Sequence, residues 1–223
     1  MTAQIGDHYF WNKKEYTAVA LSVPMNFKPQ NYGLEPQSCC TACWRGYWCE
    51  YNITEDGLFL QNFYMNNSKG NYPDLNGVSV SPVSYHEVIR LDLKRKTEAI
   101  AQAEDYMGHR KYEDIMMRIP YTGRMLVGRK FLSRYYIHMG FHRSWSYEEL
   151  REFIFENGYL KGTIDHSDMA QKIREEIESK KLKPVNTEEN IAKFVKKSFS
   201  LDYNTKAWWI KEQKFPLNEV QDG

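Results

Sequence analysis

The stretch from residue 115 to residue 147 combines positive charge with aromatic rings and contains no Asp or Glu. Arg, Tyr and Trp are enriched at protein interfaces. Because the whole chain has a net charge of only +1, this local positive field predicts an acidic protein partner. The alternative is that acids from elsewhere in the fold neutralise these side chains. The candidate binding residues are Arg118, Arg124, Arg129, Lys130, Arg134, Tyr136, Arg143 and Trp145.

Histidines and acids in and after this stretch offer a different chemistry. His138 and His142 are four residues apart, so on a strand their rings would point to the same face. Asp165 and His166 follow later in the chain. Imidazole and carboxylate groups are ligands for zinc and other transition metals. These four residues therefore predict an alternative function, a metal-dependent hydrolase or metal-binding protein. The competing interpretation is that they are half-buried or helix-capping side chains.

The four cysteines lie within one short window, residues 39–49. Cys40 and Cys43 have the two-residue spacing of a zinc knuckle, but no second pair of this kind exists. Every loop that a disulfide within the window could close is short, so we do not expect a disulfide framework. Two interpretations follow: a zinc site at Cys40 and Cys43, or thiols that are buried or idle. Only the metal alternatives require a cofactor.

Composition limits the class of protein. In a chain of 223 residues, 42% are hydrophobic and 26% charged, which is typical of one large globular domain. The net charge of +1 gives no reason to expect nucleic acid as a partner, and no apolar run has the length of a transmembrane helix. The first residues lack the pattern of a signal peptide, so the expected location is the cytoplasm and no membrane partner is expected.

Local patterns in the first half of the chain predict strands, in keeping with an aromatic content of 15%. Residues 8–23 alternate loosely and favour one or two strands. The clearest hairpin joins residues 47–53 to residues 58–65 through Asp56-Gly57, since Asp-Gly adopts the backbone angles of a tight turn.

Further strands are expected in the second half. Residues 121–127 and 134–141 have the pattern of paired strands. In residues 147–164, Asn157-Gly158 favours a hairpin, while Ser146 with Glu149 would suit the start of a short helix. We favour the hairpin.

Helices are predicted at three places. Good helix formers fill residues 94–107, which suggests one inserted helix. Asp165 can cap a second helix with an apolar stripe of Met169, Ile173 and Ile177. Asn186 or Thr187 can cap a third.

These elements predict an α+β fold. An antiparallel β-rich body, a sandwich or partly open barrel, would span residues 1–164 and include the inserted helix. Residues 165–223 would form a helical segment packed on it. No complete catalytic motif is present, so the sequence favours a non-catalytic cytoplasmic binding module, such as an inhibitor or immunity-type protein.

Overall fold

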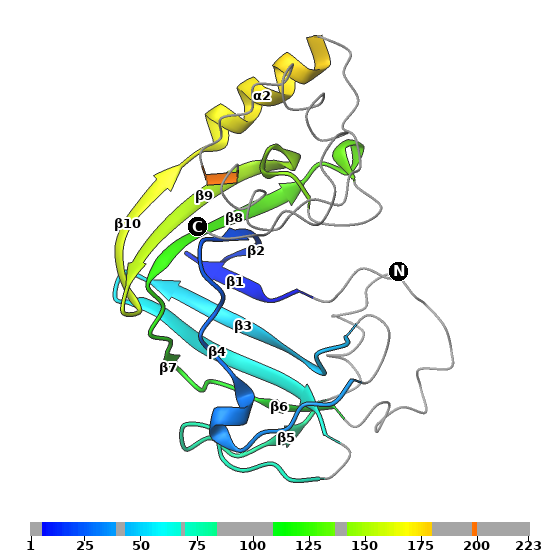
Figure 1. Cartoon of the computed structure of the whole chain (residues 1–223), viewed down its shortest axis with the longest axis vertical. Coiled ribbons are helices and arrows are strands. Elements are labelled where there is room, and N and C mark those ends of the chain that lie inside the picture. The colour runs from blue at the N-terminus through cyan, green and yellow to red at the C-terminus, as the bar shows by residue number, and fades with distance from the viewer. Residues whose placement is uncertain are drawn as a thin grey trace, which may run out of the picture.

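The computed structural model describes residues 6–38, 43–67, 70–83, 109–136, 142–179 and 198–199. Ten strands form one continuous sheet (Figure 1). They are β1 (His8–Trp11), β2 (Lys14–Leu21), β3 (Tyr47–Thr54), β4 (Gly57–Asn66), β5 (Ser81–Pro82), β6 (His109–Tyr112), β7 (Met117–Arg118), β8 (Gly123–Phe131), β9 (Tyr147–Glu156) and β10 (Tyr159–Asp165). Residues 198–199 are helical as well, and the other helices in the described ranges are η1 (Pro29–Tyr32), η3 (Ser133–Tyr135) and η4 (Ser144–Ser146), all of the 3-10 type, and the α-helix α2 (Ser167–Ser179).

The fold is β-rich with one main helix in its described part, in broad agreement with the α+β prediction. The sheet order is β10-β9-β8-β2-β1-β3-β4-β6-β5, and β7 pairs with β4. The sheet is mixed, because β1 and β3 run parallel, so the prediction of a purely antiparallel sheet was wrong. A tight turn at Asn12 and Lys13 reverses the chain into β2, whereas the long connection across residues 22–46 lets β3 approach β1 in the parallel sense.

Both predicted hairpins are present. β3 pairs antiparallel with β4 across the turn that ends at Gly57. β9 pairs antiparallel with β10 across Asn157 and Gly158, whose φ angles of 49° and 79° suit the tight turn that Asn-Gly favours. The alternative of a helix within residues 147–164 was therefore wrong.

The sheet is curled, and its two hairpin turns meet. Leu58 N donates to Gly158 O over 2.9 Å, and Gly158 N donates to Tyr121 O over 2.8 Å. Figure 1 shows β4, β9 and β10 coming together on one side of the molecule, from which the strands spread apart. The concave face that results encloses the larger core cluster, whose largest fully buried side chains include Tyr9, Tyr51, Phe63, Tyr121 and Phe153.

The opposite face of β8 and β9 carries a second core beneath α2. Ala170, Ile173 and Ile177 of α2 pack there against residues that include Leu126 and Leu150. Met169, which the sequence predicts on the buried stripe, is exposed, and Arg174 is buried in its stead. The buried side of α2 is thus rotated from the predicted one, because its contacts are to β9 and η4.

The remaining predictions concern a strand at residues 134–141, two further helices and membrane-spanning segments. Residues 134–141 were predicted as a strand paired with residues 121–127. Residues 137–141 lie outside the described residues, but Ser133–Tyr135 form η3, and β8 pairs with β2 and β9, so the predicted pairing was wrong. The inserted helix near residues 94–107 lies outside the described residues, as does the third predicted helix apart from residues 198–199. None of the described helices has the length and hydropathy needed to cross a membrane.

Candidate functional site

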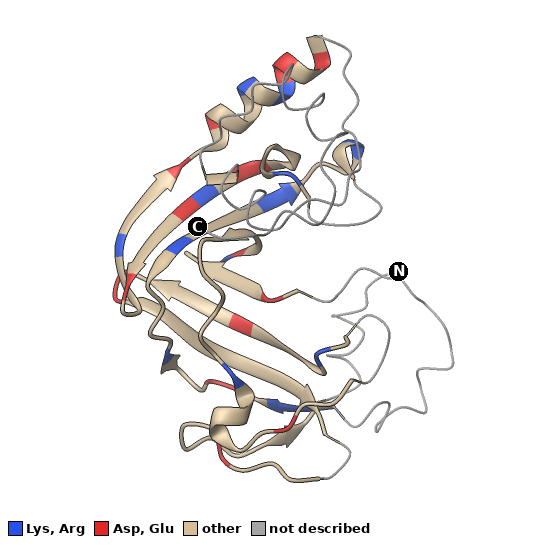
Figure 2. Ribbon diagram, viewed as in Figure 1, with Lys and Arg blue, Asp and Glu red and all other residues tan. Residues whose placement is uncertain are grey.

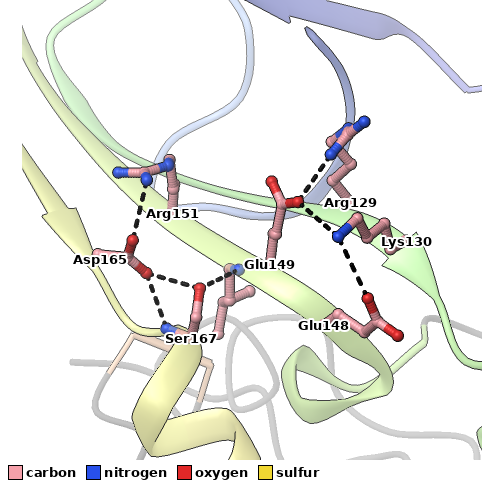
Figure 3. A network of polar contacts seen from close by, with 8 residues as sticks. Arg129, Lys130, Glu148, Glu149, Arg151, Asp165 and Ser167 are labelled. Atoms are coloured by element: carbon pink, nitrogen blue, oxygen red, sulfur yellow. Dashed lines mark hydrogen bonds and ion pairs between the residues drawn. The ribbon is translucent and has the colours of Figure 1, made fainter.

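Acidic side chains pair with most of the basic residues on the predicted binding face. Arg129 Nη1 lies 2.7 Å from Glu149 Oε1, and Lys130 Nζ lies 3.1 Å from the same oxygen (Figure 3). Arg134 Nη2 lies 3.0 Å from Glu178 Oε1 on α2. Figure 2 shows basic and acidic positions close together over β8, β9 and α2. The positive field expected from the sequence is therefore largely compensated by acids of β9 and α2.

The register of the sheet explains this pairing. Arg129 of β8 lies directly opposite Glu149 of β9. The acid-free stretch ends at Tyr147, and acids follow at residues 148, 149 and 152. Neutralisation by acids from elsewhere in the fold was the alternative that the sequence offered, but these acids were not identified, because residues 121–127 were paired with residues 134–141 and not with β9.

Arg118 and Arg124 have partners other than the surface acids that pair with Arg129, Lys130 and Arg134. Arg118 Nη1 donates to Asp56 O over 2.7 Å, and its guanidinium lies 4.2 Å from the centre of the Tyr159 ring. It therefore belongs to the place where the two hairpin turns meet. Arg124 pairs with the buried carboxylate of Glu152.

Aromatic rings gather where β8 ends. The His142 ring lies 4.5 Å from the Phe131 ring and 5.4 Å from the Tyr136 ring, centre to centre. Tyr136 is 57% exposed and Phe131 is 36% exposed. Burial lowers the pKa of His142, which favours the neutral ring, and the ring packs against the two aromatic side chains. We call Phe131, Tyr136 and His142 the aromatic face.

The remaining two residues of the predicted face lie in the interior. Trp145 is 1% exposed and belongs to the core beneath α2. Arg143 is 3% exposed, at the residue before η4. Neither side chain is available at the surface, because η4 turns under α2 and buries this part of the chain.

The structure gives the metal candidates separate partners. His142 belongs to the aromatic face, whereas His166 Nε2 lies 2.8 Å from Glu152 Oε2. Asp165 pairs with Arg151 at 2.9 Å and accepts a hydrogen bond from Ser167 N at the start of α2 (Figure 3). Asp165 thus has the capping role that the sequence offered as the competing interpretation.

His138 and Cys40 lie outside the described residues. Cys43 is a buried free thiol whose Sγ lies 3.7 Å from Tyr47 O. Within the ranges that the structure describes, no group of three or more His, Cys, Asp or Glu residues has the geometry to hold a metal ion.

No family model, curated protein or solved structure matches this chain. Its function has to be inferred from its own geometry.

A buried polar cluster that sequence reasoning missed lies between β9 and α2. Glu152 is fully buried and accepts hydrogen bonds from Arg124 Nε and from His166 Nε2. Burial alone would raise the pKa of Glu152, but these two hydrogen bonds hold it below its usual range. The Arg124 guanidinium also lies 4.8 Å from the centre of the Phe199 ring.

The position of Glu152 in the sequence indicates such a cluster. On a strand, Glu152 shares a face with Leu150 and Ile154, so an acid interrupts an apolar alternation. An acid at such a position requires buried partners. Chemically, the Glu152–His166 pair resembles the arrangement in which a carboxylate orients a general base, and here it also ties β9 to the start of α2.

Proposed function

We propose that this chain is a non-catalytic protein-binding module, of the kind that inhibits or blocks another protein, and that it binds through the aromatic face. The observation that carries the proposal is the exposure of Tyr136 and Phe131, at 57% and 36%, around the ring of His142. Rigid aromatic side chains supply much of the binding energy at protein interfaces, because they bury a large area and lose little conformational freedom.

The backbone at this place supports the proposal. Lys130, directly before Phe131, has a φ of 57°, which is uncommon for a residue with a Cβ atom. Conformations of this kind cost free energy and are concentrated at functional sites. The left-handed residue at the end of β8 sets the direction in which the chain presents Phe131.

The charges beside the aromatic face suggest the chemistry of the partner. Lys130 and Arg134 are about half and three-fifths exposed, yet each already pairs with an acid of this chain, at Glu149 and Glu178. Acidic side chains of a partner would compete with Glu149 and Glu178 for these two cations. We therefore expect the partner's acids at the rim of the interface and not at its centre. The proposed partner is therefore an acidic protein with an apolar patch at the centre of its contact surface.

The proposal also includes a cytoplasmic location and a curled sheet that acts as a partly open barrel. Cys43 and Cys49 are free thiols, which fits a reducing compartment. The contact between the two hairpin turns would hold the curled sheet, and with it the end of β8, in one shape.

The proposal is tested by quantitative capture of a stoichiometric partner from lysate of the source cells. We expect the double variant Phe131→Ser, Tyr136→Ser to bind the captured protein at least about tenfold more weakly, because the aromatic anchors are lost. The matched control is Tyr159→Ser, since Tyr159 is 49% exposed but lies on β10 at the hairpin turns. Equal capture by wild type and by the double variant would refute the proposed face.

A further inference from the structure

Three residues form one row across β8, β9 and β10. Arg124 lies directly opposite Ile154, and Ile154 lies directly opposite Gly162. Side chains that lie directly opposite each other in antiparallel strands share a face of the sheet. Arg124 also shares this face with Leu126, two residues further along β8, which packs beneath α2. The row therefore lies on the face that carries α2, next to the core beneath that helix.

The Arg124 side chain is fixed at one end and open at the other. Its Nε donates to the carboxylate of Glu152, which is fully buried. Its guanidinium also lies 4.8 Å from the centre of the Phe199 ring. The side chain is nevertheless 47% exposed, and its two terminal nitrogens donate to no residue that the structure describes. A guanidinium held through Nε presents these two nitrogens as a planar fork of donors.

The acid that holds Arg124 also serves a second side chain. Among the described residues, Glu152 is the only acid that acts on Arg124. Its other oxygen, Oε2, lies 2.8 Å from His166 Nε2. Arg134, by contrast, pairs at 3.0 Å with Glu178, an acid that is itself exposed. The exposed end of Arg124 thus has no acid of its own, and its fork can accept an anion from solvent.

Gly162 leaves the sheet without side-chain cover beside this fork. A Cβ atom added at Gly162 would meet one atom of the described residues within 4 Å, Ile154 Cδ1 at 3.9 Å. Ile154 is partly buried, and Ile164, which shares the face, is 41% exposed. Because Arg124 reaches across to β9, its guanidinium lies about one strand spacing, roughly 5 Å, from β10. Glycine within a strand often marks a place where a ligand approaches the backbone.

We propose that Arg124, Ile154, Gly162 and Ile164 bind a small organic carboxylate with an apolar body. The carboxylate accepts two hydrogen bonds from the terminal nitrogens of Arg124. The apolar body lies over Gly162 and covers the two isoleucines, which removes apolar surface from water. This site lies at the start of β8, whereas the aromatic face lies at its end. The proposed function and this site can therefore fail separately.

The test is an NMR titration of the full chain with three probes at constant ionic strength and pH 7. The probes are cyclohexanecarboxylate, acetate and cyclohexylmethanol. With cyclohexanecarboxylate, we expect saturable shifts of the Gly162 and Ile164 amide signals. Acetate lacks the apolar body and cyclohexylmethanol lacks the charge, so each should bind at least about tenfold more weakly.

Two variants address the two halves of the site. Gly162→Val places methyl groups where the apolar body would lie, and we expect binding at least about tenfold weaker. This variant should fold, because the φ of Gly162 is not in the left-handed region, its Cβ position is open, and valine suits a strand. Arg124→Lys keeps the charge but loses the fork, so binding should again be at least about tenfold weaker.

The matched control is Arg134→Ala, which removes an exposed arginine away from this row and should leave binding unchanged. Absence of saturable cyclohexanecarboxylate binding by wild type would overturn the proposal. Equal binding of cyclohexanecarboxylate and cyclohexylmethanol would also overturn it, because the arginine would then contribute nothing. Unchanged binding in Gly162→Val would do the same, and this variant decides the matter if Arg124→Lys does not fold.

Discussion

Replacing Gly158 with Ala is expected to lower the free energy of unfolding by about 3 kcal/mol or more. Gly158 has a φ of 79°, which a residue with a Cβ atom adopts only at a cost. An added Cβ atom would also overlap the carbonyl oxygen of Ile119. Relief would require the β9–β10 turn to move away, which breaks the hydrogen bonds from Gly158 N to Tyr121 O and from Leu58 N to Gly158 O. Chemical denaturation monitored by tryptophan fluorescence measures the change.

Gly77→Ala is the matched control for this variant. Gly77 has a φ of 78°, nearly the same as Gly158, but no atom lies within 4 Å of the position of its added Cβ. Its substitution should therefore cost only about 1 kcal/mol, the cost of the backbone conformation alone. Similar losses of stability for the two variants would mean that contact between the hairpin turns does not hold the curled sheet together.

Replacing Glu152 with Ala is expected to destabilise the protein by about 3 kcal/mol. The change leaves Arg124 and His166 without their shared acceptor and opens space in a fully buried part of β9. Glu148→Ala, on the same strand but half-exposed, should leave the unfolding midpoint unchanged within error. Thermal and denaturant unfolding of both variants measures the difference. Equal midpoints for the two variants would contradict a structural role for Glu152.

The lowered pKa of Glu152 predicts the direction of the pH dependence. A carboxyl group with a pKa lower in the folded than in the unfolded state stabilises the fold above its unfolded pKa, near 4.3 to 4.5. This stabilisation is lost as the pH falls through the folded pKa. Glu149 and Asp165 also have lowered pKa values and contribute to the same acid sensitivity. Stability should therefore fall less steeply below about pH 4.5 in Glu152→Gln than in wild type, and the difference isolates Glu152.

Local sequence signals predicted the two hairpins correctly, but they did not predict which distant strands pair. Asp56-Gly57 and Asn157-Gly158 carry their turn conformation in two residues, so both turns could be read from the sequence. The parallel pairing of β1 with β3 depends on the path of residues 22–46, which no local pattern encodes. The acids opposite Arg129 and Lys130 were equally hidden, because they become neighbours only when β9 pairs with β8.

The candidate site was only partly predictable for the same reason. Tyr136, one of the candidate binding residues, is exposed. Trp145 is of a residue type that is enriched at interfaces, but η4 and α2 bury it. The burial of Arg174 had no sequence signal at all, since its acceptors are the backbone carbonyls of Trp145 and Tyr147. Every residue has a backbone carbonyl, so the sequence does not show which carbonyls accept a hydrogen bond from a side chain.

The most direct test of the binding function is site-specific photo-crosslinking in the source cells. A benzoylphenylalanine in place of Tyr136 lies on the aromatic face, while the same group in place of Tyr159 reports on an exposed tyrosine at the hairpin turns. We predict one discrete crosslinked protein from position 136 and none from position 159. Crosslinking from position 159 alone, or from neither position while the chain is folded, would contradict binding through the aromatic face.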